Sequence, residues 1–341
     1  MLSKSKSKIF YFGFYLTAFL VCLILFNGKL NQHIHLQDAK SLASSSISDS
    51  LVSEQKKMLE FMLVRDVTND IEDRKKYRWL YKKVEVKFYS LVEKLNINFL
   101  KEKHIVLLHY SLIIFFTFLF SMESIRVLFS TLDKKTLFFS GLFFFLMYST
   151  VLLITSLDEW FTYVEAFAIS LAIYASLKKN MLLFAISVLI GVSVRESSLL
   201  LGVIYPLVNY RLIGTLKSVF LAVMPFVIFF IINNDIIDKF FDLVLHVSTG
   251  EERPSLLNPN SLLMLQAGEI LFSSLVYTVF LLPLVVLVFH KRVLKSYNWL
   301  FNLIIIHLFV IFFGSYYGNY TLLMLLIPTY VLLAAIIFKY E

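Results

Sequence analysis

Long runs of apolar residues fill most of this sequence, and only short polar stretches separate them. A helix needs about 20 consecutive apolar residues to cross a bilayer, and a spanning segment must satisfy its own backbone hydrogen bonds. The runs after the first hundred residues are 105–120, 136–156, 160–177, 181–194, 197–210, 215–232, 269–289, 299–313 and 320–338. The pattern therefore predicts an all-α polytopic membrane protein.

The composition favours the same class of protein. The chain of 341 residues is 58% hydrophobic, and its mean hydropathy of +0.76 lies far outside the range of soluble globular proteins. The net charge of +8 does not indicate nucleic acid, because the cations concentrate at the termini, in short connections and in one long loop. The only cysteine, Cys22, lies in an apolar run, which excludes a disulfide framework and a thiol metal site.

The N-terminal region 1–26 begins with Lys4, Lys6 and Lys8, which precede an apolar run from 9 to 26. This arrangement is similar to a signal peptide, but the run is long and no small-x-small cleavage site follows it. We therefore expect an uncleaved first transmembrane helix whose N-terminus lies in the cytoplasm.

Residues 27–104 form the one large polar insertion, which we expect to be an extracytoplasmic loop. Apolar side chains recur there at three- and four-residue spacing, and lysines fill the opposite face. The apolar positions are Tyr81, Val84, Phe88, Leu91 and Leu95. This spacing predicts an amphipathic helix on the lipid surface of the membrane, with a soluble helical hairpin as the alternative. The remaining region, 105–341, is expected to be a multi-span domain with a second extracytoplasmic loop at 233–268.

An adjacent cation and anion, Arg195 and Glu196, interrupt the apolar run from 181 to 208. An ionised side chain at the bilayer centre costs about 2.5–3.5 kcal/mol on insertion scales, so two such charges must pair, reach water or line a cavity. The segments 181–194 and 197–210 are each too short to span the membrane alone. Either they form one long helix that contains Arg195, or they are two half-helices that meet at Arg195-Glu196.

The distribution of basic residues decides between these two options. With two separate segments, the clusters of lysine and arginine in the short connections fall on one side, which the positive-inside rule identifies as cytoplasmic, and Arg195-Glu196 falls on the other. A single long helix would instead place Lys291, Arg292 and Lys295 outside. We therefore expect about ten membrane segments with both termini in the cytoplasm. The Lys, Ile and Phe bias is typical of a bacterial protein, which favours the inner membrane.

Several polar residues are expected to converge on the extracytoplasmic side. Asp158 and Glu159 precede the segment that begins at residue 160, where carboxylates stabilise a helix N-terminus by about 0.3–1 kcal/mol, so capping alone explains them too. Glu165 follows Asp158 by seven residues, on the same helical face and about two turns below the membrane surface. An unpaired carboxylate is costly there, so we expect Glu165 to pair with Arg195 or to be protonated.

Arg195 itself favours the binding of a phosphate. The guanidinium fork and the N-terminus of a half-helix both suit phosphate oxygens. A purely structural ion pair is the alternative for Glu165 and Arg195. In the loop 233–268, His246 near Glu251-Glu252 could hold a divalent cation, but this spacing matches no metal motif, so no metal site is predicted. The sequence also contains no Gly-rich phosphate loop, nucleophile elbow or HExxH motif.

The layout resembles the GT-C superfamily of integral membrane glycosyltransferases that use polyprenyl-phosphate sugars. Its members share a first span followed by a large extracytoplasmic loop with amphipathic helices, and many bacterial members carry an Arg-Glu pair between two short helices. The similar stretches here are Arg195-Glu196-Ser197, the acidic helix start Asp158-Glu159-Trp160, Tyr77-Arg78-Trp79-Leu80, and the last span at 318–328. The arginine that members often carry before the last span is absent, and Tyr320-Thr321 stand in its place.

The resemblance implies transfer of a sugar from a polyprenyl-phosphate-linked donor to an acceptor on the extracytoplasmic face. No cofactor is predicted, and a divalent metal stays open as an alternative. In an inverting mechanism a first-loop carboxylate, Asp66 or Asp70, acts as the base, and Arg195 with Arg78 holds the phosphate. The remaining candidate substrate-binding residues are Asp158, Glu159, Glu165 and Glu196. Two alternatives remain at this point, a transporter or flippase of lipid-linked glycans and a non-catalytic membrane relative.

Overall fold

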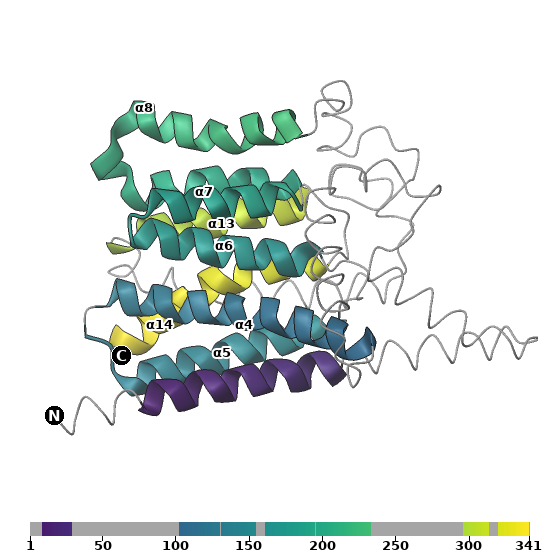
Figure 1. The fold of residues 1–341 in the computed structure, drawn as a ribbon. Helices are drawn as coiled ribbons and strands as arrows, with labels where there is room; N and C mark the ends of the chain where they lie inside the picture. Colours follow the sequence, from purple (N-terminus) through teal and green to yellow (C-terminus); the bar gives the residue numbers. More distant parts are fainter. Residues whose placement is uncertain are drawn as a thin grey trace, which may run out of the picture.

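The computed structural model describes residues 9–28, 102–129, 131–154, 161–194, 196–232, 296–313 and 320–340. Helices make up all the regular structure in these residues, and no strand occurs among them (Figure 1). In chain order they are the N-terminal helix Ile9–Gly28, α4 (Glu102–Leu128), α5 (Lys134–Ile154), α6 (Phe161–Leu177), α7 (Met181–Val192), the 3₁₀-helix η3 (Glu196–Leu200), α8 (Leu201–Ile232), α13 (Asn298–Phe313), the 3₁₀-helix η5 (Tyr320–Leu326) and α14 (Ile327–Tyr340).

Within the described residues, four stretches of helix are long and apolar enough to cross a membrane, namely Ile9–Gly28, Leu107–Leu128, Lys134–Leu152 and Ser197–Ile231. Shorter apolar helices accompany them at Thr162–Leu177, Met181–Val192, Asn298–Phe309 and Leu323–Lys339. The predicted all-helical membrane protein is thus confirmed at this level. The predicted span 269–289 and nearly all of the predicted loops 27–104 and 233–268 lie outside the described residues.

The helices lie side by side and run back and forth between two ends of a bundle (Figure 1). One end holds the start of the N-terminal helix, the α4–α5 connection, the α6–α7 turn, the bend in α8 and the end of α14. We call it the basic end. Hydrogen bonds tie its parts together, because Lys339 Nζ donates to the carbonyl oxygen of Thr131 and Asn209 Nδ2 donates to the carbonyl oxygen of Ser176 over 2.8 Å. The other end, which we call the opposite end, holds the start of α6 and the α7–η3 junction.

Helix α6 is the centre of the bundle, and its described side chains are nearly all buried. It packs against α4, α7, α8, η5 and α14. Small side chains line it, and they let neighbouring helices approach closely where lipid removes the hydrophobic drive between helices. These residues are Ala166, Ala168, Ala172, Ala175 and Ser176.

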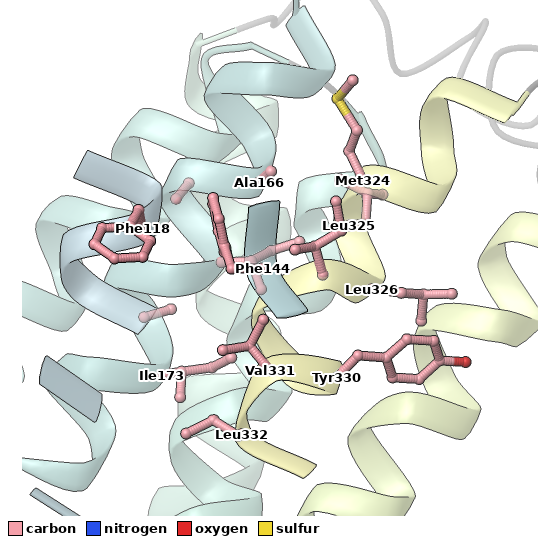
Figure 2. Packing of buried hydrophobic residues seen from close by; sticks show 14 of the residues in the cluster. Phe118, Phe144, Ala166, Ile173, Met324, Leu325, Leu326, Tyr330, Val331 and Leu332 are labelled. Carbon is pink, nitrogen blue, oxygen red and sulfur yellow. The ribbon is translucent and has the colours of Figure 1, made fainter. Parts of the chain in front are cut away.

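The core lies where α4, α5, α6 and α14 meet. Figure 2 shows Phe118 and Phe144 on one side of it and Leu325 and Val331 on the other. The Phe118 and Phe144 rings are 5.2 Å apart in an edge-to-face arrangement, a geometry worth about 0.5–1.5 kcal/mol beyond burial. The packing of these elements around α6 holds this helix in place, together with the residues at its start.

Helix α7 turns back antiparallel onto the start of α8. Two pairs of residues that are placed symmetrically about residue 195 meet across this hairpin. The Phe184 and Tyr205 rings are 5.2 Å apart, and a Cβ added at Gly191 would lie 3.0 Å from Ser198 Cβ. The two apolar segments on either side of Arg195 are therefore separate helices rather than one.

Helix α8 consists of two parts that fold back on each other. Gly214 has a φ of 72°, in the left-handed region that favours glycine, and Asn209 is also non-helical. The two parts pack closely, because a Cβ added at Gly202 would lie 2.7 Å from the carbonyl oxygen of Ala222. The bend separates the predicted segments 197–210 and 215–232.

Candidate functional site

A buried carboxylate lies near the α7–η3 junction at the opposite end. Glu165 stands in the second turn of α6 and is only 1% exposed. Its Oε1 accepts a hydrogen bond of 2.6 Å from Ser197 Oγ and one of 3.1 Å from Ser198 Oγ. Both serines belong to η3, so this group, which we call the glutamate–serine cluster, joins the central helix to the segment after Arg195.

The hydrogen bonds of the glutamate–serine cluster compensate for the hydration that Glu165 loses on burial. A carboxylate taken into a membrane bundle loses its hydration, and hydrogen bonds to a charged group offset about 1.5–3 kcal/mol each. The sequence led us to expect that Glu165 pairs with Arg195 or is protonated, and Arg195 lies outside the described residues. The partners that the structure does describe, Ser197 and Ser198, were not predicted. No periodic pattern in the sequence links these two serines to Glu165, which lies more than thirty positions earlier.

Local hydrogen bonds end α7 just before Arg195. The amide of Ser193 donates to the carbonyl oxygen of Leu189 over 3.1 Å, and the amide of Val194 donates to that of Gly191 over 2.9 Å. The second bond spans only three residues, which tightens the final turn. Val194 is fully buried, and Ser197 on the other side of position 195 is hydrogen-bonded to Glu165, so described residues on both sides of this position have fixed contacts.

Of the other predicted site residues, Glu196 alone lies within the described residues. Glu196 is the first residue of η3 and directly precedes the two serines. Its neighbours Ser197 and Ser198 contact Glu165, so the structure brings the regions of these two predicted residues together. The remaining predicted residues lie outside the described ranges, and these are Asp66, Asp70, Arg78, Asp158, Glu159 and Arg195.

Three buried tyrosines meet near the start of α6, namely Tyr163 of α6 itself, Tyr110 of α4 and Tyr148 of α5. The rings of Tyr110 and Tyr163 lie 5.9 Å apart, and those of Tyr148 and Tyr163 lie 6.2 Å apart. Phe26 of the N-terminal helix stacks on Tyr110 at 4.8 Å. Tyr163 and Glu165 are two residues apart and therefore point about 200° away from each other around α6. The tyrosines anchor α6 to the N-terminal helix, α4 and α5, while Glu165 anchors it to η3.

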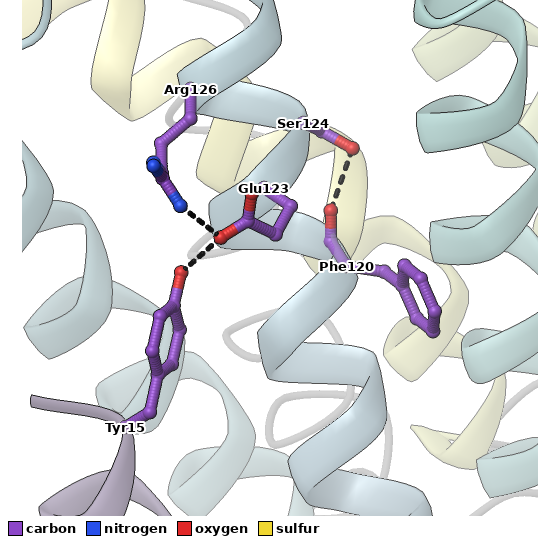
Figure 3. Close-up of polar contacts among 5 residues, drawn as sticks. All are labelled: Tyr15, Phe120, Glu123, Ser124 and Arg126. Atoms are coloured by element: carbon purple, nitrogen blue, oxygen red, sulfur yellow. Dashed lines mark hydrogen bonds and ion pairs between the residues drawn. The ribbon is translucent and has the colours of Figure 1, made fainter. Parts of the chain in front are cut away.

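A second polar cluster lies toward the basic end. Figure 3 shows Tyr15 OH and Arg126 Nη1 meeting at Glu123 Oε1, each over 2.6 Å. The guanidinium of Arg126 also lies 4.6 Å from the centroid of the Tyr11 ring. This cluster was not predicted from the sequence. The three-residue spacing of Glu123 and Arg126 within an apolar helix was the available signal for an ion pair, whereas nothing in the sequence connected it to Tyr15.

The described residues contain no group of three or more His, Cys, Asp or Glu side chains that could hold a metal ion. No protein-family model, curated protein or solved structure matches this chain. A function for this protein therefore has to be argued from the arrangement of its own residues.

Proposed function

We propose that this protein is a membrane glycosyltransferase of the GT-C type, which moves a sugar from a polyprenyl-phosphate-linked donor to an acceptor on the extracytoplasmic face. The supporting observation is the helix break between Val192 and Glu196, which the buried carboxylate of Glu165 ties to the central helix. A break at one end of a membrane bundle puts a polar chain segment at the depth of lipid phosphates.

In the proposed site, Arg195 binds the phosphate of the donor. It stands between two fixed points in the chain, the amide of Val194 bonded to Gly191 and the side chain of Ser197 bonded to Glu165. Because these described neighbours have fixed contacts, we propose that the Arg195 guanidinium loses less conformational freedom when it binds a phosphate in a bidentate manner. Glu165 therefore acts as a positioning residue in this scheme.

The proposed reaction is an inverting displacement. The acceptor hydroxyl oxygen attacks the anomeric carbon of the sugar, and the carboxylate of Asp66 or Asp70 takes the hydroxyl proton. The bond between the anomeric carbon and the phosphate oxygen breaks, and its electron pair leaves with the polyprenyl phosphate. Arg195 and Arg78 stabilise the leaving negative charge. Asp158, Glu159 and Glu196 bind and orient the acceptor, and the scheme uses no cofactor.

The charges at the basic end support the proposed orientation in the membrane. Eight basic residues but only two acidic ones, Glu123 and Asp133, lie toward that end among the described residues. The basic residues are Arg126, Lys134, Lys135, Lys178, Lys179, Arg211, Lys217 and Lys339. The positive-inside rule puts this end in the cytoplasm and the glutamate–serine cluster at the extracytoplasmic surface. About ten segments in a bacterial inner membrane, with both termini inside, complete the proposed topology.

The direction of the two 3₁₀-helices favours an enzyme over a transporter built from an inverted repeat. A 3₁₀-helix precedes the first part of α8 and another precedes α14, and both of these segments run from the opposite end toward the basic end (Figure 1). Two inverted repeats would instead make their corresponding broken helices run in opposite directions across the membrane. A flux assay in vesicles tests the transporter directly, since transport leaves every glycosidic bond unchanged.

The test of the proposed enzyme replaces Arg195 by Ala in the full chain. Membranes that carry the variant are incubated with a panel of radiolabelled polyprenyl-phosphate sugars, and transfer is measured together with protein abundance. We expect sugar transfer to fall about 100-fold or more at normal abundance, because a charge-stabilising group for the leaving phosphate is lost. Arg211→Ala, at the basic end, is the matched control and should keep full transfer. Full transfer by Arg195→Ala would overturn the proposal.

A further inference from the structure

One face of α5 combines two exposed cations with an exposed apolar stripe. Lys134 and Lys135 begin the helix at the basic end, and both are exposed. Below them Phe138, Leu142 and Leu146 are 55%, 56% and 63% exposed and follow one another at four-residue spacing. Residues at this spacing lie on one side of a helix, so the cations stand at the head of a continuous apolar track.

Neighbouring elements border this track on both sides. On one side Lys134 Nζ lies 4.8 Å from the centroid of the Phe10 ring of the N-terminal helix. On the other side the Phe139 ring lies 5.8 Å from the Phe338 ring of α14. The next residue of α14, Lys339, donates to the carbonyl oxygen of Thr131 and so adds a third cation at the α4–α5 connection.

The acidic residues nearby already have partners. The Asp133 carboxylate accepts a hydrogen bond of 3.3 Å from the amide of Thr136 at the start of α5. The Glu123 carboxylate accepts from Arg126 and from Tyr15. Lys134 and Lys135 therefore present positive charge at the depth where the bundle ends and lipid headgroups begin.

We propose that this face of α5 is a binding site for an anionic phospholipid. The phosphate lies against Lys134 and Lys135, and one acyl chain follows Phe138, Leu142 and Leu146. Basic pockets between membrane helices recognise anionic headgroups by the same combination of charge and apolar contact. A second copy of the chain fits this face poorly, since a symmetric dimer through it would bring the same lysines face to face.

The experiment uses the full-length protein in nanodiscs with phosphatidylglycerol or phosphatidylcholine that carries a photoreactive diazirine in the acyl chain. After illumination, labelled peptides are mapped by mass spectrometry. We expect phosphatidylglycerol to label the α5 peptides at least fivefold more than phosphatidylcholine. The Lys134→Gln/Lys135→Gln variant should lose this preference, whereas Lys134→Arg/Lys135→Arg should keep it. The matched control Arg211→Gln/Lys217→Gln removes the same charge from the bend of α8 and should also keep it.

Four results would overturn the proposed lipid site. Equal labelling by the two lipids would remove the headgroup preference, and an equal loss in the α8 control would reduce it to a general effect of the basic end. Competition by millimolar glycerol phosphate would indicate a site for free phosphate. Cross-links between two copies through α5 would indicate a dimer interface. If the Lys134→Gln/Lys135→Gln variant fails to fold, the ratio of labelling by the two lipids and the map of labelled peptides in the natural chain still test the proposed site.

Discussion

At the scale of single residues, the contacts of Glu165 best explain how the opposite end is held together. Its carboxylate is buried in the most enclosed helix of the bundle and is reached by hydroxyl groups from an element more than thirty residues later. A buried polar group of this kind destabilises a bundle when its partners are removed. The two serines are thus expected to contribute both to stability and to the position of Arg195.

The first prediction concerns these hydroxyl groups. The Ser197→Ala/Ser198→Ala variant should be less stable by about 1–3 kcal/mol, because it removes two donors from a buried carboxylate. Unfolding in detergent measures the change. Ser149→Ala is the matched control, since the Ser149 hydroxyl donates to the Phe145 carbonyl oxygen of its own helix, and it should change stability by less than about 0.5 kcal/mol. Equal effects of the two variants would contradict a special role for Glu165.

The second prediction concerns pH and the start of α5. Hydrogen bonding from Thr136 lowers the pKa of Asp133 below its usual value of 3.8. A lowered pKa in the folded state means that the cap stabilises α5 above pH 3.8 and loses this effect as the pH falls further. Amide exchange at residues 134–137, corrected for intrinsic rates, should therefore speed up about threefold between pH 6 and pH 3. Asp133→Asn keeps a capping oxygen without the charge and should remove most of this pH dependence.

At the scale of elements, the sequence predicted the helices better than their contacts. The apolar runs 136–156, 160–177 and 181–194 correspond to α5, α6 and α7 within two residues at each end. Hydropathy reports what lipid can accept, so it locates spans well. It does not report which side chains meet, because helices in lipid associate through close packing and polar contacts. The contact of Tyr15 with Glu123 and that of Ser197 with Glu165 could not be predicted for this reason.

The third prediction tests close packing within the α8 hairpin. A Cβ at Gly202 would lie 2.7 Å from the Ala222 carbonyl oxygen and 2.8 Å from that of Leu221, and neither backbone atom can move aside alone. Gly202→Ala should therefore destabilise the protein by about 1–3 kcal/mol. Gly13→Ala in the N-terminal helix meets nothing within 4 Å and should stabilise it by about 0.5–1 kcal/mol. Thermal unfolding of both variants in the same detergent separates the two outcomes, and a stabilised Gly202→Ala protein would contradict the packing.

At the scale of the whole molecule, the account rests on the two ends of the bundle. The chain turns back at the opposite end between α7 and η3, and it turns back again at the basic end at the Gly214 bend of α8. The first-loop acids of the proposed site, Asp66 and Asp70, lie outside the described residues. What the described helices supply is a rigid frame, in which α6 holds η3 through the glutamate–serine cluster.

The most direct measurement is the labelling of a single cysteine by a membrane-impermeant maleimide in right-side-out vesicles. Cys22 is first replaced by Ala, and then either Arg195→Cys or, as the control at the basic end, Thr215→Cys is introduced. We expect Arg195→Cys to be labelled from outside in intact vesicles and Thr215→Cys only after permeabilisation. Labelling of Thr215→Cys alone in intact vesicles would reverse the proposed orientation and contradict sugar transfer at the extracytoplasmic surface.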